Sequence, residues 1–587
     1  MRLYKIHLKG FRNFDDAEIS LQGKTLIIGA NDVGKTNLIY ALRLLFDKTI
    51  TDHDLELSDS DYNAYSGTDQ IEITVFLDEI TEECLLSEFG GSIKDGKLII
   101  RYTNRKGGSY NFFAGFDENT LTELATRKYI RRLNLQYVDT NRDLTTFLSR
   151  ERIRILQIAK EKLSSEKVAS DQQTIESIQA SLNAINQSIS SLNYISTSLE
   201  EVNRELGKLS IHNEDQSIQF VAGDSDAGKM LDKLSLSYST GTKPLTVGGD
   251  GRNNQIFLAT WIAKQHFQDS VDHVTFYAIE EPEAHLHPHQ QRRLSAYIQN
   301  SFSSQILVTS HSPHIASQFE SLSIVRLYSE NKYTYAASGG CSEVLKRAFI
   351  DFGYRLNSLS AEVFFSDGVF LVEGVSEVLL FNALSDKIGI DLDRLNITIL
   401  SVEGIGFMPY VAVCNALNIP WVIRTDNDIF TKNKDGQSLR YYASNSRVMH
   451  LISAIGDNET GLLQYWNEHE KDNEWNSCGD IPESASALNN YVRNKACDLG
   501  IYVADYDLEN DLANSELRES LLGYYGETDL LKLVKLMQRK KAENMMAYIS
   551  DCGDDLEKLE SSSISSPIRK IADMVKRRVR PYDKSAD

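Results

Sequence analysis

The segment that most constrains the fold lies near the N-terminus and reads GANDVGKT from residue 29 to residue 36. It matches GxxxxGK[ST], follows the β-prone run TLIIG and opens the run NLIYALRLLF, which is the context that a phosphate-binding loop needs. In such a loop the backbone N–H groups surround the phosphates, the lysine neutralises them and the threonine hydroxyl binds Mg²⁺. The motif therefore predicts an α/β domain that binds ATP through Gly29, Asn31, Gly34, Lys35, Thr36 and Asn37.

Length and composition limit the class of protein. A chain of 587 residues exceeds what one hydrophobic core usually holds, so we expect two or more domains. The net charge of −21 disfavours nonspecific nucleic-acid binding, although basic clusters occur at 127–132, 539–541 and 576–580. Six cysteines without a CxxC pair indicate neither a disulfide framework nor a thiolate zinc site. Since no apolar run approaches the ~20 residues of a membrane span, we expect a cytoplasmic protein.

The spacing of apolar residues divides the chain into four stretches. Short β-prone runs fill the first 145 residues, and residues 145–209 carry apolar side chains at helical spacings of three and four. Strands alternating with helices return after Ser217, and a second such alternation begins near Gly368. We therefore expect one α/β domain in two parts, 1–145 and 213–347, a helical insertion at 146–212, and a second α/β domain at 348–587.

Two further strand ends in the first α/β domain favour nucleotide chemistry. The strand from Val274 to Ile279 ends in Glu280-Glu281-Pro282-Glu283. Here Glu280 is suited to orient Mg²⁺ and Glu281 to polarise an attacking water. The strand QILVTS ends just before His311, whose imidazole we expect to sense the γ-phosphate.

Carboxylates gather at strand ends in the second α/β domain. Glu373 ends the strand VFLVEG and Glu377 follows four residues on, while Asp426 and Asp428 end the strand WVIRT and share one side of it. A third group follows the strand IYVAD. Carboxyl ends of parallel strands are where such sheets place ligands, and so many acids in one crevice would repel unless divalent cations lay between them. The sequence therefore predicts a Mg²⁺ or Mn²⁺ site with Glu373, Glu377, Asp426, Asp428, Asp507, Glu509 and Asp511 as ligands.

The first domain resembles the ATP-binding-cassette ATPases of the SMC and RecF type. Phe11-Arg12-Asn13-Phe14 matches the early strand-turn of these proteins, and the EEPE segment and the late histidine are typical of them. The resemblance implies that nucleotide binds between two heads. The signature loop would be Val247-Gly248-Gly249-Asp250-Gly251-Arg252, which departs from the usual Ser-Gly-Gly start and predicts slow hydrolysis.

The second domain resembles the Toprim fold, through the glutamate of LVEGVSE, Gly404 and the DxD of RTDND. A head of this type with a helical insertion, followed by Toprim, is the layout of the overcoming-lysogenization-defect (OLD) nucleases, and the chain is most similar to their Gabija-type members. Residue by residue, the resemblance implies that Glu373 is catalytic, that Lys541 is the catalytic lysine, and that six acids bind metal: Glu373, Glu377, Asp426, Asp428, Glu509 and Asp511. Asp507 stands where some relatives have Ser. The neighbouring Lys540 leaves the register of the catalytic lysine open by one residue.

The leading hypothesis is a DNA endonuclease of two-metal type that the ATPase head regulates. The resemblance implies a dimer or tetramer formed through the heads and the helical insertion, double-stranded DNA as substrate, a UvrD-like helicase partner and a role in anti-phage defence. The alternative is an SMC-like ATPase that clamps DNA and uses Toprim only as a binding platform. A topoisomerase or primase is a weaker alternative, because no separate zinc-ribbon or cleavage domain can be distinguished.

Overall fold

A computed structural model describes most of the chain. The described residues are 1–140, 163–209, 226–232, 238–240, 243–245, 249–268, 272–352, 361–402, 406–434, 437–456 and 461–579, with isolated residues 142, 156, 159–161 and 218. The chain divides into two compact units, one made of residues 1–138, 271–283 and 287–587 and the other of residues 139–270 and 284–286. Each unit is described by itself.

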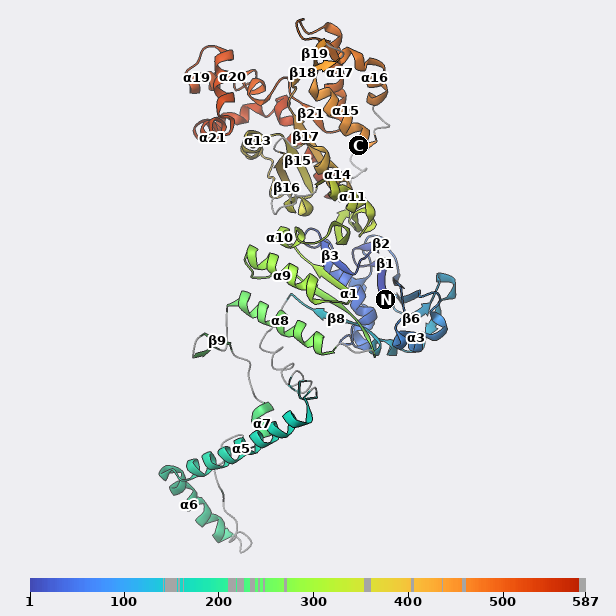
Figure 1. The fold of residues 1–587 in the computed structure, drawn as a ribbon, viewed down its shortest axis with the longest axis vertical. Coiled ribbons are helices and arrows are strands. Elements are labelled where there is room, and N and C mark those ends of the chain that lie inside the picture. The colour runs from blue at the N-terminus through green and yellow to red at the C-terminus, as the bar shows by residue number, and fades with distance from the viewer. Residues whose placement is uncertain are drawn as a thin grey trace. The chain divides into compact units, whose positions relative to one another are not determined.

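The phosphate-binding loop belongs to a six-stranded sheet of the first unit, in the order β14-β13-β3-β12-β11-β8 (Figure 1). Strands β13, β3, β12, β11 and β8 run parallel, and β14 pairs antiparallel with β13 at one edge. The strands are β3 (Lys24–Ile28), β8 (Leu133–Val138), β11 (Val274–Glu280), β12 (Ile306–Thr309), β13 (Ile324–Glu330) and β14 (Tyr333–Ala336). The helices are α1 (Lys35–Phe46), α9 (Pro288–Ser301), α10 (Pro313–Ala316) and α11 (Glu343–Phe352). The loop therefore follows a central strand.

A second, antiparallel sheet accompanies it, in the order β2-β1-β4-β5-β6-β7. Residues 5–9 of β1 alternate more exposed and buried side chains, as in a sheet with one covered face, whereas residues 73–77 of β4 are all buried. Buried side chains of both sheets and of α1 form one continuous core. The elements are β1 (Arg2–Phe11), β2 (Phe14–Ser20), β4 (Gln70–Asp78), β5 (Leu98–Arg105), β6 (Tyr110–Gly115), β7 (Thr122–Leu124), α2 (Asp52–Leu55) and α3 (Glu83–Phe89).

The other unit contains the expected helical insertion. Two of its helices, α5 (Ser165–Ser190) and α6 (Asn193–Leu209), follow each other across a short turn. In Figure 1 α6 turns away from α5 and does not lie along it, and no residue of α5 is buried. The predicted helices are therefore present in the described part, although they do not pack side by side. The remaining elements are α7 (Ala227–Asp232), β9 (Tyr238–Thr240), β10 (Lys243–Leu245) and α8 (Asp250–Gln268).

The C-terminal domain, also in the first unit, is built on a four-stranded parallel sheet in the order β16-β15-β17-β21. Its strands are β15 (Gly368–Val372), β16 (Ile397–Ser401), β17 (Trp421–Thr425) and β21 (Ile501–Val503). Gly368 admits the close approach of α22 (Ser566–Val579), because a Cβ there would lie 2.7 Å from Val575 Cγ2. Every residue of β15 and β17 is buried, in agreement with their apolar runs.

Helices and a small insertion complete this domain. Between β17 and β21 the chain forms a three-stranded sheet, β18 (Ile429–Lys434), β19 (Gln437–Tyr442) and β20 (Glu474–Asn476), with α15 (Ala443–Ile455) and α16 (Leu462–His469). The other helices are α13 (Val375–Lys387), α14 (Met408–Ala416), α17 (Glu483–Asp498), α18 (Leu508–Ala513), α19 (Arg518–Tyr525), α20 (Leu530–Arg539) and α21 (Lys541–Cys552). The predicted α/β class with two α/β domains is confirmed, and among the described residues no helix is long and apolar enough to span a membrane.

Candidate functional sites

The phosphate-binding loop joins β3 to α1 and holds its lysine inside. Lys35 Nζ donates to the carbonyl oxygens of Gly29 at 2.9 Å and Ala30 at 2.8 Å. Burial lowers the pKa of Lys35 to about 8, although the Glu281 carboxylate opposes the shift. Thr36, one residue on, is exposed in the first turn of α1, and Asn31 is exposed in the loop. A desolvated cation at a helix N-terminus is an arrangement that favours a bound phosphate.

The turn at Arg12 and Asn13 braces this loop. Gly34 has a φ of 108°, and a Cβ there would lie 2.2 Å from Asn13 Nδ2. Asn13 Nδ2 donates to the Val33 carbonyl at 2.7 Å, and Asn37 Nδ2 donates to Asn13 Oδ1 at 2.7 Å. Arg12 Nη1 donates to Asn37 Oδ1 at 2.7 Å. The structure thus places Asn37, expected among the nucleotide ligands, in the network that shapes the loop.

The acidic end of β11 meets the histidine that follows β12. Glu280 is buried, and the Tyr137 hydroxyl donates to its Oε2 at 3.1 Å. His311 Nε2 lies 3.3 Å from Glu281 Oε1. Burial, reinforced by the Lys35 ammonium, lowers the pKa of His311, so the imidazole is neutral near pH 7. The strands therefore bring the residues expected to handle the γ-phosphate to one edge of the sheet.

Glu283 is an addition to the predicted set. Its Oε1 accepts from Ser310 Oγ at 2.6 Å and from the His311 N–H at 2.8 Å, so it fixes the segment that carries the imidazole. Burial raises the pKa of Glu283. As the third acid of EEPE, Glu283 could have been predicted from the sequence.

Of the expected signature loop, Val247 and Gly248 lie outside the described residues, while Asp250 already begins α8.

The acids of the C-terminal domain lie where the strand order of its sheet reverses. From β15 the chain passes to β16 on one side and then to β17 on the other, so the strand order reverses between β15 and β17. Glu373 directly follows β15, and Asp426 and Asp428 follow β17. Ligands of open α/β sheets bind outside the carboxyl ends of the strands at such a switch point. We call Glu373, Glu377, Asp426, Asp428, Glu509 and Asp511 the acid cluster.

A buried arginine on β17 neutralises part of the acid cluster. Arg424 Nη2 donates to Asp511 Oδ2 at 2.6 Å, and Nη1 lies 3.8 Å from Glu377 Oε1 and 3.9 Å from Asp426 Oδ1. Burial raises the pKa of Glu377, and Arg424 opposes the shift. Burial also raises the pKa of Asp511, against the same arginine. Arg424 thus makes it possible to bury these carboxylates together.

Asp426 is the most strongly perturbed acid. Burial, together with the neighbouring carboxylates of Glu373 and Glu377, raises its pKa to about 8, although Arg424 opposes the shift. Within the described residues its Oδ1 is buried and has no hydrogen-bond partner, and the same holds for Oε1 of Glu509. Buried carboxylate oxygens without donors are costly, and a cation would satisfy them.

A second arginine, Arg447 on α15, contacts the more exposed acids. Its Nη1 lies 2.6 Å from Glu373 Oε1, and its Nη2 lies 3.2 Å from Asp428 Oδ2. Nη1 also donates to the Thr425 hydroxyl. Glu373 Oε1 accepts further from Thr425 Oγ1 at 2.5 Å and from the Asp426 N–H at 3.0 Å. The end of β17 therefore holds the Glu373 carboxylate in place.

The segment after β21 supplies an ion pair and a helix cap. Lys541 Nζ lies 2.9 Å from Oε2 of the buried Glu509. Asp507 is the N-cap of α18: its Oδ1 accepts from the Asn510 N–H at 2.8 Å, and its Oδ2 accepts from Gln538 Nε2 at 2.6 Å. Asp507, expected as a metal ligand, is thus engaged in local hydrogen bonds. Gly404, also part of the predicted pattern, lies outside the described residues.

The donor chemistry fits a hard divalent cation, although the acids are not gathered as ligands. Within the described ranges, no three His, Cys, Asp or Glu side chains converge closely enough to hold one ion. The guanidinium groups of Arg424 and Arg447 contact carboxylate oxygens of Asp511, Glu373 and Asp428. All candidate donors are carboxylate oxygens, as Mg²⁺ and Mn²⁺ prefer, and two of them are buried without partners.

The two arginines were not predicted. Arg424 stands inside the apolar run WVIRT, and a charge in a fully buried strand was a usable signal that it pairs with acids. Arg447 lies on a helix 19 residues after Asp428, beyond the β18–β19 hairpin, and no spacing rule connects the two positions.

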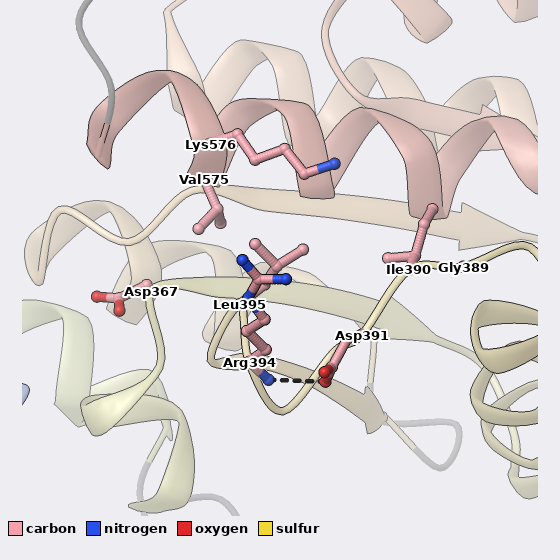
Figure 2. Close-up of a pocket in the computed structure, with 8 residues that line it drawn as sticks. All are labelled: Asp367, Gly389, Ile390, Asp391, Arg394, Leu395, Val575 and Lys576. Atoms are coloured by element: carbon pink, nitrogen blue, oxygen red, sulfur yellow. Dashed lines mark hydrogen bonds between the residues drawn. The ribbon is translucent and has the colours of Figure 1, made fainter.

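A cavity of about 400 Å³ lies elsewhere in the C-terminal domain. Figure 2 shows it between Val575 and Lys576 of α22 and the segment from Gly389 to Leu395, with Asp367 at its side. Asp367 precedes β15, whereas Glu373 follows it, so the cavity opens at the edge of the sheet opposite the acid cluster. This cavity is therefore not the site of the predicted chemistry.

Comparison with known proteins agrees with the two-domain reading. Residues 24–317 match the family model described as "AAA domain, putative AbiEii toxin, Type IV TA system". Residues 364–428 match the model "Overcoming lysogenization defect protein-like, TOPRIM domain". The second match begins just before β15 and ends at Asp428, so it covers the strands that carry Glu373 and the DxD pair.

Similar proteins extend the comparison over nearly the whole chain. The chain is 26% identical over 611 residues to "Endonuclease GajA" of Bacillus cereus (strain VD045), covering 95% of this chain and 97% of that one. It is 25% identical over 451 residues to "OLD nuclease" of Thermus scotoductus, covering 73% and 82%. The SMC head domain from Thermotoga maritima aligns with a TM-score of 0.30 and 15% identity, over 57% of this chain and 98% of that one.

These matches confirm the resemblance to OLD nucleases of the Gabija type that the motifs indicated. They also agree with the predicted order of domains, an ATPase domain followed by an OLD-like Toprim domain. Because the model over residues 24–317 spans half of the chain, the chain belongs to the AAA-domain family which that model describes, and it carries an OLD-like Toprim domain in its C-terminal part.

Proposed function

We propose that this chain is a divalent-metal-dependent DNA endonuclease, regulated by ATP, that acts in the cytoplasm against phage. The observation that carries the proposal is the acid cluster at the switch point of the Toprim sheet, with the Lys541 ammonium beside it. The relatives named above as endonuclease and nuclease support the same reading.

In this proposal the carboxylates of the acid cluster bind metal, and the neighbouring Lys541 contacts the phosphate. Glu373, Asp426 and Asp428 would hold the cation, with Glu377, Glu509 and Asp511 as further donors to a second ion. When bound, such ions supply an activated water and neutralise charge on the reacting phosphate. In this proposal Lys541 would donate to a non-bridging phosphate oxygen, where negative charge develops in the transition state.

A basic helix face next to Lys541 supports nucleic acid as the substrate. Lys532, Lys535 and Arg539 lie at helical spacing on one exposed face of α20, which carries no acidic residue. Among the described residues none of these three cations has an ion-pair partner, and Lys532 stands in the first turn, where a positive charge is unfavourable. Gln538 of the same helix donates to Asp507, which lies two residues before Glu509 of the acid cluster. A phosphate backbone tracked along α20 would reach Lys541.

The ATPase head is proposed to regulate cleavage through occupancy of Lys35 and the residues around it. The chain is further proposed to form a dimer or tetramer through the heads and the helical insertion, and to act with a UvrD-like helicase. The helical insertion supports the first of these, because α5 and α6 expose apolar side chains.

Plasmid cleavage by the purified full-length protein tests the function. Supercoiled plasmid is incubated with Mg²⁺ or Mn²⁺ without ATP, and the wild type is expected to produce nicked or linear DNA. Glu373→Gln removes a proposed ligand and should abolish the products. Glu519→Gln changes an exposed carboxylate of the same domain and should leave them unchanged. Intact plasmid in every reaction would favour the DNA clamp, and relaxed circles without ends would favour a topoisomerase.

A further inference from the structure

Arg447 bridges two carboxylates that are proposed to hold the divalent cation. Its two terminal nitrogens divide between Glu373 Oε1, at 2.6 Å, and Asp428 Oδ2, at 3.2 Å. Its side chain is 26% exposed, and those of the two acids are 28% and 36% exposed. The guanidinium therefore lies at the open side of the acid cluster, unlike Arg424, whose side chain is 4% exposed.

Arg447 is presented to the acids by a well-anchored helix. The first turn of α15 is joined to the end of β17 by two hydrogen bonds, from the Ala443 N–H to the Asp428 carbonyl at 2.8 Å and from Ser444 Oγ to Asn427 Oδ1 at 2.5 Å. Asn445 Nδ2 donates to Asn473 Oδ1 at 2.9 Å. Because these side chains are buried, the backbone of α15 has little freedom to withdraw, and Arg447 can leave the acids only by changing its own rotamer.

The Arg447 guanidinium occupies one oxygen of each carboxylate, Glu373 Oε1 and Asp428 Oδ2. Glu373 Oε1 already accepts from Thr425 and Asp426, so the contact with Arg447 completes its environment. A divalent ion on Glu373 and Asp428 would stand where the guanidinium stands, and the two positive groups would repel at that distance. Binding the ion thus requires that the arginine be displaced.

We infer that Arg447 competes with the divalent cation for Glu373 and Asp428 and so sets the metal concentration at which the site is filled. This inference rests on the proposed function and goes beyond it, because it assigns Arg447 a positioning role that no sequence motif indicated. Removing the guanidinium leaves the two carboxylates to repel each other until a cation enters. The affinity for metal should therefore rise, on the order of tenfold for one charged hydrogen-bonded contact of this exposure.

The test measures Mn²⁺ binding to the full-length protein without nucleotide or DNA, by calorimetry. Arg447→Gln is expected to bind Mn²⁺ about tenfold more tightly than the wild type. Arg447→Lys keeps the charge without the two-pronged geometry and should lie in between. Arg101→Gln is the matched control, because Arg101 on β5 also joins two carboxylates, Glu72 and Glu118, far from the acid cluster in the fold. Its affinity should equal that of the wild type.

Thermal unfolding provides a second readout that a merely structural role would not produce. In the presence of a chelator, Arg447→Gln should unfold at a lower temperature than the wild type. Addition of Mn²⁺ should raise the unfolding temperature of Arg447→Gln by more than it raises that of the wild type. An unchanged or weaker Mn²⁺ affinity in Arg447→Gln would overturn the inference while leaving a wild type that binds metal and cleaves DNA as the proposed nuclease. A wild type that neither binds Mn²⁺ nor cleaves would instead refute the proposed function itself.

Discussion

Lys541 Nζ lies 2.9 Å from Oε2 of Glu509, a carboxylate whose side chain is only 2% exposed. The preceding residue has the same chemistry and a different partner, since Lys540 Nζ lies 2.7 Å from Glu543 Oε2 and both of these side chains are about two-thirds exposed or more. Of these two adjacent lysines, Lys541 is therefore the one that contacts the acid cluster.

Lys541→Ala is expected to lower the rate of plasmid cleavage by about 10²- to 10³-fold, the usual effect of removing one preorganised donor to a developing charge. Lys540→Ala should stay within a few-fold of the wild type, because it removes only a surface ion pair. Initial rates at saturating Mn²⁺ make the comparison. Equal losses in the two variants would show that the lysines act together on DNA binding and would remove Lys541 from the chemistry.

Metal binding should depend on pH through Asp426, whose pKa burial and the carboxylates of Glu373 and Glu377 raise to about 8. A carboxylate must lose its proton to bind a cation, so below pH 8 binding releases a proton and the affinity should rise about tenfold per pH unit. Above pH 8 it should level off. Calorimetry with Mn²⁺ between pH 6 and pH 9 measures the slope. Asp426→Asn should bind more weakly and with a smaller slope, and an identical slope would assign the proton to another group.

The strands of the nuclease site were predictable because each ends in a conspicuous acid. VFLVEG and WVIRTDND combine a buried apolar run with carboxylates at its end, and in the structure Glu373, Asp426 and Asp428 follow the carboxyl ends of the neighbouring parallel strands β15 and β17. The helical run after β21 is interrupted, because α18 ends at Ala513 and α19 begins at Arg518. Ser515 Oγ accepts from the Leu517 N–H at 3.1 Å, a local bond that competes with helix continuation.

What the sequence did not predict depends on contacts between distant segments. The pairing of Arg447 with Glu373 joins residues 74 positions apart, and it depends on how the β18–β19 hairpin returns α15 to the end of β17. The bracing of the phosphate-binding loop by Asn13 likewise joins Val33 and Thr334, from three separate elements. Periodicity reports which face of an element is buried, and it carries no information on which distant side chain meets it.

ATP binding should weaken at alkaline pH through Lys35, whose pKa burial lowers to about 8. The ammonium must be protonated to neutralise phosphate, so the affinity should be nearly constant below pH 8 and fall about tenfold per pH unit above it. Lys35→Arg keeps its charge at every accessible pH and should lose this decline, whereas Lys35→Ala should lose most of the binding. Titration of ATP between pH 7 and pH 9.5 makes the comparison. A wild-type affinity that is flat to pH 9.5 contradicts the assignment.

Oligomer formation should depend on the apolar side chains that the helical insertion exposes. Ile185 on α5 is 52% exposed and Val202 on α6 is 46% exposed. Burying them against another subunit would be favourable, so the double variant Ile185→Ser, Val202→Ser should have a lower mass in light scattering at equal concentration. Leu86→Ser changes a comparably exposed leucine of α3 and should keep the wild-type mass. If both variants keep the wild-type mass, the exposed apolar side chains of α5 and α6 do not contribute to contacts between subunits.

Millimolar ATP is expected to restrain DNA cleavage, and its depletion to release it. The departure of the signature loop from Ser-Gly-Gly predicts slow ATP hydrolysis. At the millimolar ATP of a growing cell, the ATPase heads would therefore remain occupied by nucleotide. Occupied heads can favour one arrangement of the Toprim domains only if nucleotide binds that arrangement more tightly. The opposite sign, activation by ATP in a clamp that closes before cutting, is the competing expectation.

The decisive experiment titrates ATP at fixed free Mg²⁺, because chelation by the nucleotide lowers the metal available to the acid cluster and would itself resemble inhibition. Under that control the wild type should lose cleavage as ATP rises, and Lys35→Ala should cleave at every ATP concentration as the wild type does without ATP. Restraint that persists in Lys35→Ala at fixed free Mg²⁺ would come from ATP acting elsewhere than the phosphate-binding loop. Cleavage that rises or stays flat in the wild type would show that nucleotide occupancy does not hold the nuclease off.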